Sequence, residues 1–298
     1  MTQYIRSHWK KLLLSTLRDT LSWLLMFITG TGALIAFMPA EEAAWLRTLV
    51  NTGWVQVWPL ILVILFILGV ALLRNRPVMK AVYVDKKTDL KVIIECCDLL
   101  RQEGLKVIHT VDTFDMELNT IISPRSLHGA FLKLCREKGV DPDEQIDKTI
   151  AKIKPVRTNK ALPSRKDQYS LGTVCPVDVA GQPFCCVAFT RLQPNGSIEI
   201  SKEEYIRCLT RMWRGLADPR VRCQEVNVAV MGNRFVDMPA EFSTEQKIDL
   251  MIQTFFAAAR EKACCRTLRI CVHSNNVTDI DFDQYPVIIE HLAKRPVI

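Results

Sequence analysis

Hydrophobic and polar positions divide this chain into a front part with two long uncharged runs and a longer part in which short apolar segments alternate with polar ones. The runs cover residues 20–40 and 48–73 and hold 21 and 26 residues without a charge. A helix needs about 20 mostly apolar residues to cross the hydrocarbon core of a bilayer. The pattern therefore predicts an N-terminal two-helix transmembrane hairpin, with spans at about residues 20–40 and 55–73.

The charges that flank these runs predict the orientation of the hairpin. Lys and Arg gather before the first run and after the second: Arg6, Lys10, Lys11, Arg18, Arg74, Arg76 and Lys80. The loop between the runs holds Glu41, Glu42 and Arg47. Positive charge stays on the cytoplasmic side, so both termini are expected there. Residues 1–77 are then a membrane hairpin, and residues 78–298 are a cytoplasmic domain.

Two readings of the front end stay open. The first run can be a cleaved signal peptide, although it is longer than the usual apolar core of about 7–15 residues and a second run follows. The basic segment at residues 2–19 can lie on the inner membrane surface or extend the first span.

From Lys80 onward the pattern alternates between strand and helix periods. Apolar, β-branched segments predict strands at residues 80–84, 105–111, 169–177, 184–192, 226–231 and 267–272. Helical spacing predicts helices at residues 89–103, 126–138, 141–153, 244–261 and 280–293, and another that Ser201 opens with a capping box to Glu204. This alternation predicts an α/β sheet with helices on both faces. The continuously apolar segment 226–231 is expected to be a buried central strand.

Composition narrows the classes of function. Charged residues make up 24% of the chain and hydrophobic residues 49%, which is typical of a globular protein. All 11 cysteines lie at or after Cys96, on the predicted cytoplasmic side, where thiols stay reduced. Their spacing contains no C-x-x-C pair, so no metal site is predicted, and we expect buried, unreactive thiols.

Catalytic signatures are missing as well. The chain has no G-x-S-x-G elbow, no H-E-x-x-H pair and no G-x-x-x-x-G-K-[ST] phosphate loop. We therefore expect a binding protein rather than an enzyme. The basic segment at residues 154–166 predicts a loop or insertion, whose Lys and Arg are either solvated or in contact with an anion.

Two junctions after predicted strands can bind a ligand, because ligands of α/β sheets lie beyond the carboxyl ends of the strands. Residues 121–129 lead into a helix whose first N–H groups suit a phosphate, and Ser123, Arg125 and Ser126 can add donors. The alternative is ordinary helix capping by Ser126.

The second junction, residues 231–235, follows the buried strand. Gly232 allows close backbone approach, Arg234 can meet a phosphate and Phe235 can stack on a base or ribose. The alternative is a surface loop. Asp112 and Asp115, after the strand at residues 105–111, can bind ribose hydroxyls or cap their own loop.

These residues carry a resemblance to a divergent Macro-domain group. The run from Phe114-Asp115 through Ile121-Ile122-Ser123 to Phe131 resembles that group, as do residues 169–174 (YSLGTV) and the buried strand that runs into Gly232. With two membrane helices in front, the chain resembles the membrane effectors of type II Thoeris anti-phage systems. The resemblance implies a Macro-like α/β fold with a mixed sheet flanked by helices.

The resemblance also implies a ligand and a mode of action. Ser123, Ser126 and Gly129 match the first phosphate-binding loop, Gly232, Asn233, Arg234 and Phe235 match the second, and Asp115 matches a position near the ligand. The second loop usually holds several glycines, and Asp112 stands where an Asn is expected.

The expected ligand is an ADP-ribose derivative, an amino-acid conjugate such as histidine-ADP-ribose, made from NAD by a TIR enzyme. No further cofactor is implied. Binding is expected to assemble a homo-oligomer that disrupts the lipid bilayer of the bacterial inner membrane and causes cell death or growth arrest. A membrane-tethered ADP-ribosyl hydrolase and an anchored nucleotide- or RNA-binding module are the alternatives, although no nucleic acid is expected as a partner.

Overall fold

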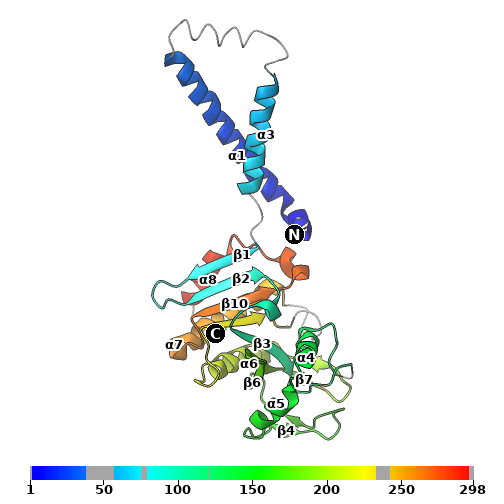
Figure 1. Ribbon diagram of the computed structural model, residues 1–298. Coiled ribbons are helices and arrows are strands. Elements are labelled where there is room, and N and C mark those ends of the chain that lie inside the picture. Colours follow the sequence, from blue (N-terminus) through cyan, green and yellow to red (C-terminus); the bar gives the residue numbers. More distant parts are fainter. Residues whose placement is uncertain (1, 38–56, 75–78, 120, 233–241, 295–298) are drawn as a thin grey trace. The chain divides into compact units, whose positions relative to one another are not determined.

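The structure is a computed structural model that describes residues 2–37, 57–74, 79–119, 121–232 and 242–294 (Figure 1). The chain forms two compact units, Met1–Val78 and Met79–Ile298. Each unit has a character of its own: the first is built from helices, and the second from a sheet with helices on its faces.

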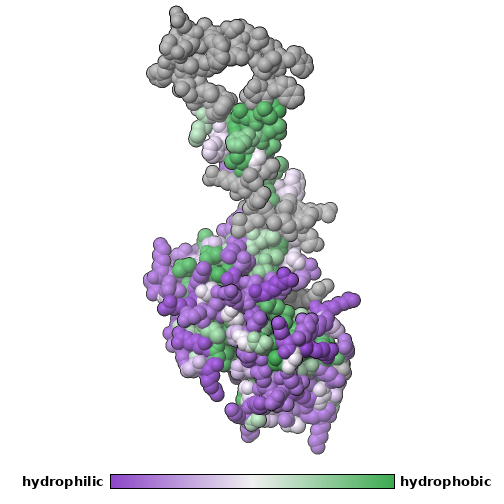
Figure 2. Space-filling view, in the orientation of Figure 1, coloured by the Kyte–Doolittle hydropathy of each residue, from purple (hydrophilic) through white to green (hydrophobic). Residues whose placement is uncertain are grey.

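The first unit contains two long helices, α1 (Thr2–Phe37) and α3 (Val57–Arg74). The basic lead at residues 2–19 is continuous with α1, so it extends the first predicted span as a helix. Many side chains on both helices are apolar and exposed, and Leu14, Leu62 and Phe66 expose 67%, 63% and 73% of their surface. Figure 2 shows this apolar surface on the described part of α3. Among the described residues, no helix meets the combined length and hydropathy criteria for a membrane span.

The second unit is built on one mixed sheet with the strand order β1-β2-β10-β9-β3-β7-β6. Its strands are β1 (Lys80–Val84), β2 (Lys91–Cys96), β3 (Leu105–Val111), β6 (Val174–Val179), β7 (Gln182–Leu192), β9 (Glu225–Ala229) and β10 (Thr267–Val272). The five inner strands run parallel, whereas β1 and β6 pair antiparallel at the two ends, and β8 (Ile198–Glu199) extends β7. The carboxyl ends of β2, β10, β9, β3 and β7 therefore share one edge of the sheet.

Helices cover both faces of this sheet, as the alternation predicted. On one face α4 (Leu127–Glu137) packs on β3 and α5 (Pro142–Ile150) packs on β6. On the other, α6 (Lys202–Leu216) packs on β7, α7 (Thr244–Lys262) contacts α6, and α8 (Tyr285–Lys294) contacts α7 and β1 (Figure 1). Side chains of β7 alternate between the faces: Cys186 joins the α4 side, and Phe189 stacks on Tyr205 of α6.

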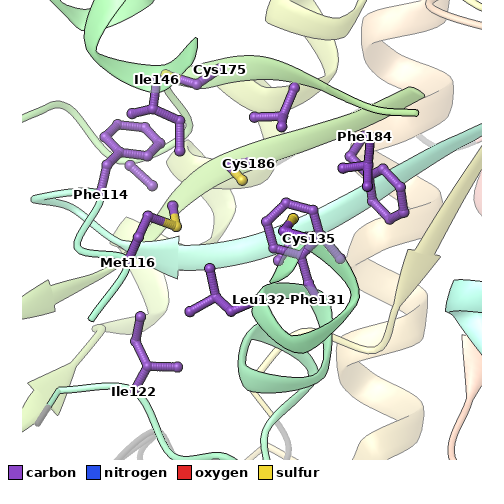
Figure 3. Packing of buried hydrophobic residues seen from close by; sticks show 14 of the residues in the cluster. Phe114, Met116, Ile122, Phe131, Leu132, Cys135, Ile146, Cys175, Phe184 and Cys186 are labelled. Carbon is purple, nitrogen blue, oxygen red and sulfur yellow. The ribbon is translucent and has the colours of Figure 1, made fainter. Parts of the chain in front are cut away.

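The core under α4 is aromatic and closely packed (Figure 3). Phe131 of α4 is fully buried, and its ring centroid lies 5.1 Å from that of Phe184 on β7. Phe114 is equally buried beside Tyr169. Burial of one such side chain stabilises the fold by about 1.5–3 kcal/mol, so α4 is held rigidly against the parallel centre of the sheet.

One predicted helix is wrong. Residues 89–103 form strand β2 and the short 3-10 helix η2 (Leu99–Arg101) instead of a helix. Val92, Ile93 and Ile94 lie between β1 and β10 and are buried on both faces. A short run of this kind satisfies both the helical and the strand template, and pairing with two neighbouring strands decides the outcome.

Other boundaries also differ from the prediction. The strand expected from residue 169 begins at Val174, because Gly172, with φ +85°, turns the chain where a Cβ would meet Cys208 O at 2.5 Å. The last helix begins at Tyr285, after the 3-10 helix η3 (Ser274–Asp279). The basic loop includes β4 (Arg157–Thr158), which pairs antiparallel with β5 (Asp167–Gln168) directly after the loop. Strands β1, β3 and β10 have the predicted bounds, and the Ser201–Glu204 capping box is confirmed.

Candidate functional site

The carboxyl edge of the sheet brings the two predicted junctions to the same side of the domain. Strands β3 and β9 are parallel neighbours, with Leu105 opposite Val226 and Val107 opposite Val228. Asp112 directly follows β3, and Gly232 lies three residues after β9. The loop at residues 123–129 starts α4, which packs on β3. The fold thus places β-strand ends and a helix start together, as an α/β ligand site requires.

Ser126 organises the loop before α4. Its hydroxyl donates to the Ser123 carbonyl over 2.7 Å and accepts from the Gly129 N–H over 2.9 Å, so it is the N-cap residue of the helix. The Ser123 hydroxyl accepts from the Arg125 N–H over 3.3 Å, whereas Arg125 itself is exposed. Ser123 and Ser126 therefore shape the loop, and Arg125 is the residue of this set that lies at the surface.

Gly129 lets the loop fold back tightly onto the helix. A Cβ at this position would lie 2.3 Å from the Ser123 carbonyl oxygen and 2.9 Å from Pro124 Cα, both of them backbone atoms. The first N–H groups of a helix have no acceptor within it. Here the Gly129 and Ala130 N–H groups bond to Ser126, which leaves those of Leu127 and His128 unpaired within the described residues. Two free donors at a positive helix end suit an anion.

Asp112 is tied into the structure by four hydrogen bonds. Its carboxylate accepts from the Leu192 N–H and from the Gln168 side-chain amide, both over 3.0 Å. Its own N–H donates to the Thr190 carbonyl, and its carbonyl accepts from Tyr169 N–H, both over 2.8 Å. Burial raises the pKa of Asp112 to about 6, although the Leu192 N–H and Arg191 act in the opposite direction. Asp112 thus joins the ends of β3, β7 and β5.

Asp115 is buried a few residues further along the same loop. Its carboxylate accepts from the Thr113 hydroxyl over 2.5 Å and from the Arg165 N–H over 3.2 Å. Phe114, between Thr113 and Asp115, has a φ of +52°, which is uncommon for a residue other than glycine. The strained turn and the Asp115 contacts attach the loop after β3 to the basic segment that carries Arg165.

The loop after β9 is described only at its start. Gly232 is buried with a φ of +83°, and its carbonyl accepts from Lys247 Nζ over 2.9 Å. Asn233, Arg234 and Phe235 lie outside the described residues. The contact with Lys247, which is on the first turn of α7, fixes the point where this loop leaves the sheet.

His128, at the start of α4, is buried, whereas His109, on β3, is half-buried with its ring against Phe189 of β7; both are neutral. Burial lowers the pKa of His109 to about 4. Burial, with a smaller effect from His109, lowers the pKa of His128 to about 3. His128 Nε2 lies 3.1 Å from Met116 Sδ. The attraction of this edge for an anion therefore comes from backbone dipoles and not from imidazolium charge.

Sequence reasoning missed three features near this edge. Lys247 occupies a buried position in the apolar stripe of α7, and burial lowers its pKa; a lysine inside a helical apolar pattern was the available signal. Cys97 Sγ lies 3.1 Å from Cys271 Sγ, across the ends of β2 and β10, and the mistaken helix at residues 89–103 hid this neighbour. Arg191, Arg207 and Arg211 line a cavity with Asp112. The part of the chain that the structure describes contains no cluster of three metal-ligating side chains.

The second unit is thus an α/β domain with a mixed sheet, a parallel centre, a tightly capped helix start and a glycine three residues after a buried strand. Residues 92–273 match the family model described as Thoeris protein ThsA, Macro domain. The match spans more than half of the chain and includes Asp112, Asp115, the α4 loop and Gly232. The chain belongs to this family, and its second unit is a Macro domain. A search of curated proteins found no match.

Solved structures with a similar fold include macrodomains of Oceanobacillus iheyensis. One with ADP is 10% identical, with a TM-score of 0.44, and covers 71% of this chain and 98% of its own. Another, with MES bound, is also 10% identical, with a TM-score of 0.45, and covers 71% of this chain and 99% of its own.

Proposed function

We propose that this protein is a Thoeris effector whose Macro domain senses an ADP-ribose-derived signal and whose helical unit acts on a membrane. The observation that carries the proposal is the match to the ThsA Macro family over the residues that form the carboxyl edge. The α4 loop adds a physical reason, because its free N–H groups lie at a positive helix end where a diphosphate binds well.

The ligand we propose is an amino-acid conjugate of ADP-ribose, such as histidine-ADP-ribose, produced by a TIR-domain enzyme. Its diphosphate would lie against Ser126, Gly129 and the start of α4. The loop that begins at Gly232 would cover it from the side of β9, with Asn233, Arg234 and Phe235 as its contacts. Asp115 and Arg125 would complete the site from the loops before α4.

The domain binds its ligand in this proposal and does not hydrolyse it. Hydrolysis needs a group that can activate water, and Asp112, with a pKa raised by burial to about 6, is the carboxylate of this edge nearest to that requirement. Asp112 and Asp115 are the buried carboxylates of this edge, and each already accepts two hydrogen bonds from the protein. His128 is buried, His109 is half-buried, and both are neutral. These contacts favour structural roles for all four residues.

The first unit is proposed as a membrane hairpin with both termini in the cytoplasm. The described chain exposes 17 large hydrophobic side chains, and 13 of them lie on α1 and α3, which marks these helices as a surface for an apolar partner. The uncharged runs at residues 20–40 and 48–73 are long enough to cross a bilayer, and parts of both lie outside the described residues. We assign the partner as the lipid of the bacterial inner membrane.

Assembly would connect the two units in function. A single hairpin without ionisable residues in its spans offers no polar path across a bilayer, so several copies must associate to permeabilise it. A ligand shifts such an equilibrium only through its differential affinity for the two states. Binding at the Macro domain would therefore favour an oligomer that disrupts the membrane and stops growth.

The experiment is a titration of the full-length protein, purified in detergent, with ADP-ribose and histidine-ADP-ribose. Calorimetry should detect binding, and light scattering should detect a ligand-dependent increase in particle mass. Liposomes that contain the protein should release a trapped dye only with ligand. Binding without a change in mass or leakage would exclude the effector mechanism, absence of binding would exclude the sensor, and ligand turnover would favour the hydrolase.

A further inference from the structure

A cavity lined by arginines lies beside Asp112, on the side of the sheet where β7 ends. Its volume is about 220 Å³. Four arginines line it: Arg157, Arg191, Arg207 and Arg211. Its inner wall is formed by Asp112, Gln168, Tyr169 and Leu171, all of them buried. The residues come from the loop after β3, from β4, β5, β7 and α6, and from the segment before β6, so the tertiary fold alone assembles them.

The charges around this cavity do not cancel. Glu204 pairs with Arg191 over 2.7 Å and closes the capping box of α6. Asp112, the other acid, accepts two hydrogen bonds from neutral amides. Within the described residues no carboxylate pairs with Arg157, Arg207 or Arg211, although seven other arginines form ion pairs. With Asp112 and Glu204 both ionised, the four arginines still leave a net charge of +2 around one small concave space.

The available contacts leave these guanidinium groups with donors to spare. Arg211 Nη1 donates to the Leu171 carbonyl over 3.0 Å, which fixes its head at the rim. Arg207 Nε donates to the Glu203 carbonyl one turn earlier in α6. Each guanidinium has five N–H donors in a planar fork that matches phosphate oxygens. One contact to a carbonyl uses only a small part of this capacity.

We propose that the arginine cavity is a second anion site of this protein, which binds a small, water-soluble phosphorylated compound. The cavity is smaller than the roughly 300–1,000 Å³ of sites that enclose a drug-sized ligand, so it suits one or two phosphate groups and not a whole dinucleotide. Its donors are side chains, in contrast to the backbone donors of the α4 loop. The basic segment at residues 154–166 contributes Arg157 and so has an anion contact as its role.

Inorganic pyrophosphate titrated into the full-length protein tests this site. The Arg157→Gln/Arg207→Gln variant removes two exposed cations without breaking an ion pair of the described chain, and it should weaken pyrophosphate binding by at least about tenfold, since charge-assisted bidentate contacts are lost. The matched control is Arg222→Gln/Arg266→Gln, which removes two exposed charges near the amino ends of β9 and β10. This control should bind as wild type does.

Three further measurements complete the test. Thermal unfolding checks that both variants fold, and Arg157→Lys/Arg207→Lys, which keeps the charge but loses the fork, should fall between wild type and the Gln variant. In the Gly129→Ala background, removal of the two arginines should still weaken pyrophosphate binding. The arginine variants should give the same ADP-ribose titration as wild type, whether or not the sensor proposal holds. Equal weakening by both Gln pairs, unchanged binding in the cavity variant, or no binding of millimolar pyrophosphate to wild type would overturn the proposal.

Discussion

The α4 loop and the arginine cavity both suit an anion, but they are built in different ways. In the loop, Ser123, Ser126 and Gly129 direct backbone N–H groups outward from a helix start that rests on a buried aromatic core. In the cavity, mostly exposed arginines surround a small concavity. One region supplies fixed dipoles, and the other supplies mobile charges.

This difference indicates how specific each region can be for its ligand. Fixed N–H groups need no rearrangement on binding, so they favour a ligand of defined geometry. Exposed charges attract any phosphate, and salt screens that attraction over a Debye length of about 8 Å at physiological ionic strength. We therefore expect specificity to reside in the loop, and a strongly salt-dependent affinity in the cavity.

The largest expected effect comes from the support under the loop. Phe131→Ala removes a fully buried ring that packs on Phe184, and such truncations lower the free energy of unfolding by about 3–5 kcal/mol. Urea denaturation of the full-length protein measures this loss. Val287→Ala, at an exposed side chain of α8, is the control and should change little. A loss below about 1 kcal/mol for Phe131→Ala would mean that α4 is not anchored by its core.

The second prediction tests ligand binding by the α4 loop separately from the stability of the core beneath it. Gly129→Ala places a Cβ 2.3 Å from the Ser123 carbonyl, so the loop must move and the donors are displaced. A hydrogen bond to a charged group contributes about 1.5–3 kcal/mol, which predicts a tenfold to hundredfold loss of ADP-ribose affinity by calorimetry. Gly139→Ala at the other end of α4, where a Cβ meets no atom, should destabilise modestly through its φ of +67° but bind normally. Equal binding by both variants would contradict the loop assignment.

A smaller effect distinguishes helix capping from ligand contact at Ser126. Ser126→Ala removes the N-cap and should lower stability by about 0.5–2 kcal/mol. Ser126→Asp keeps a cap and should restore stability in thermal unfolding. Its carboxylate would repel a bound diphosphate, so ADP-ribose affinity should fall in the Asp variant despite the intact fold. Normal affinity in Ser126→Asp would show that Ser126 only caps the helix.

The last effect concerns Asp112, which follows β3 and lines the arginine cavity. The pKa of Asp112 is about 6 in the folded protein and about 3.9 in an unfolded chain. The folded state therefore binds the proton more tightly, and the free energy of unfolding falls as pH rises from about 4 to 6. Asp112→Asn should reduce this fall, with a loss of about 0.5–1.5 kcal/mol for the weakened Gln168 contact.

Chemical denaturation at several pH values measures the effect as the difference between variant and wild type. Asp249→Asn is the control, because burial also raises the pKa of Asp249 to about 6, but this residue lies on α7. It should reduce the pH-dependent fall in the free energy of unfolding in the same direction. An unchanged pH slope in Asp112→Asn would show that folding does not raise the pKa of Asp112.

Local signals in the sequence predicted most elements of the Macro domain. The capping box at Ser201 and the β-branched strands at residues 105–111 and 267–272 follow from short-range preferences, and the structure confirms them. The helix predicted at residues 89–103 was wrong, since the apolar spacing of this segment fits a strand as well as a helix. Only the pairing of β2 with β1 and β10 removes that ambiguity.

The candidate site also combines residues that local sequence signals indicated with contacts that only the tertiary structure shows. The sequence pointed to Ser123, Ser126 and Gly232 because they follow strands or start a helix, and the resemblance to Macro domains added Gly129. It gave no sign that Asp112 bonds to Leu192, or that Lys247 reaches the Gly232 carbonyl. Both contacts join positions far apart in the chain, and a pattern within a short window carries no information about them.

The sequence by itself determined the alternation of strands and helices, the uncharged runs and the capped start of α4, because each depends on neighbours within about one or two helical turns. The tertiary structure decided the strand order, the buried state of the two aspartates and the meeting of four arginines around one cavity. Charges from β4, β7 and α6 come together only in the folded domain, since burial and electrostatic environment are properties of the folded chain and not of its local segments.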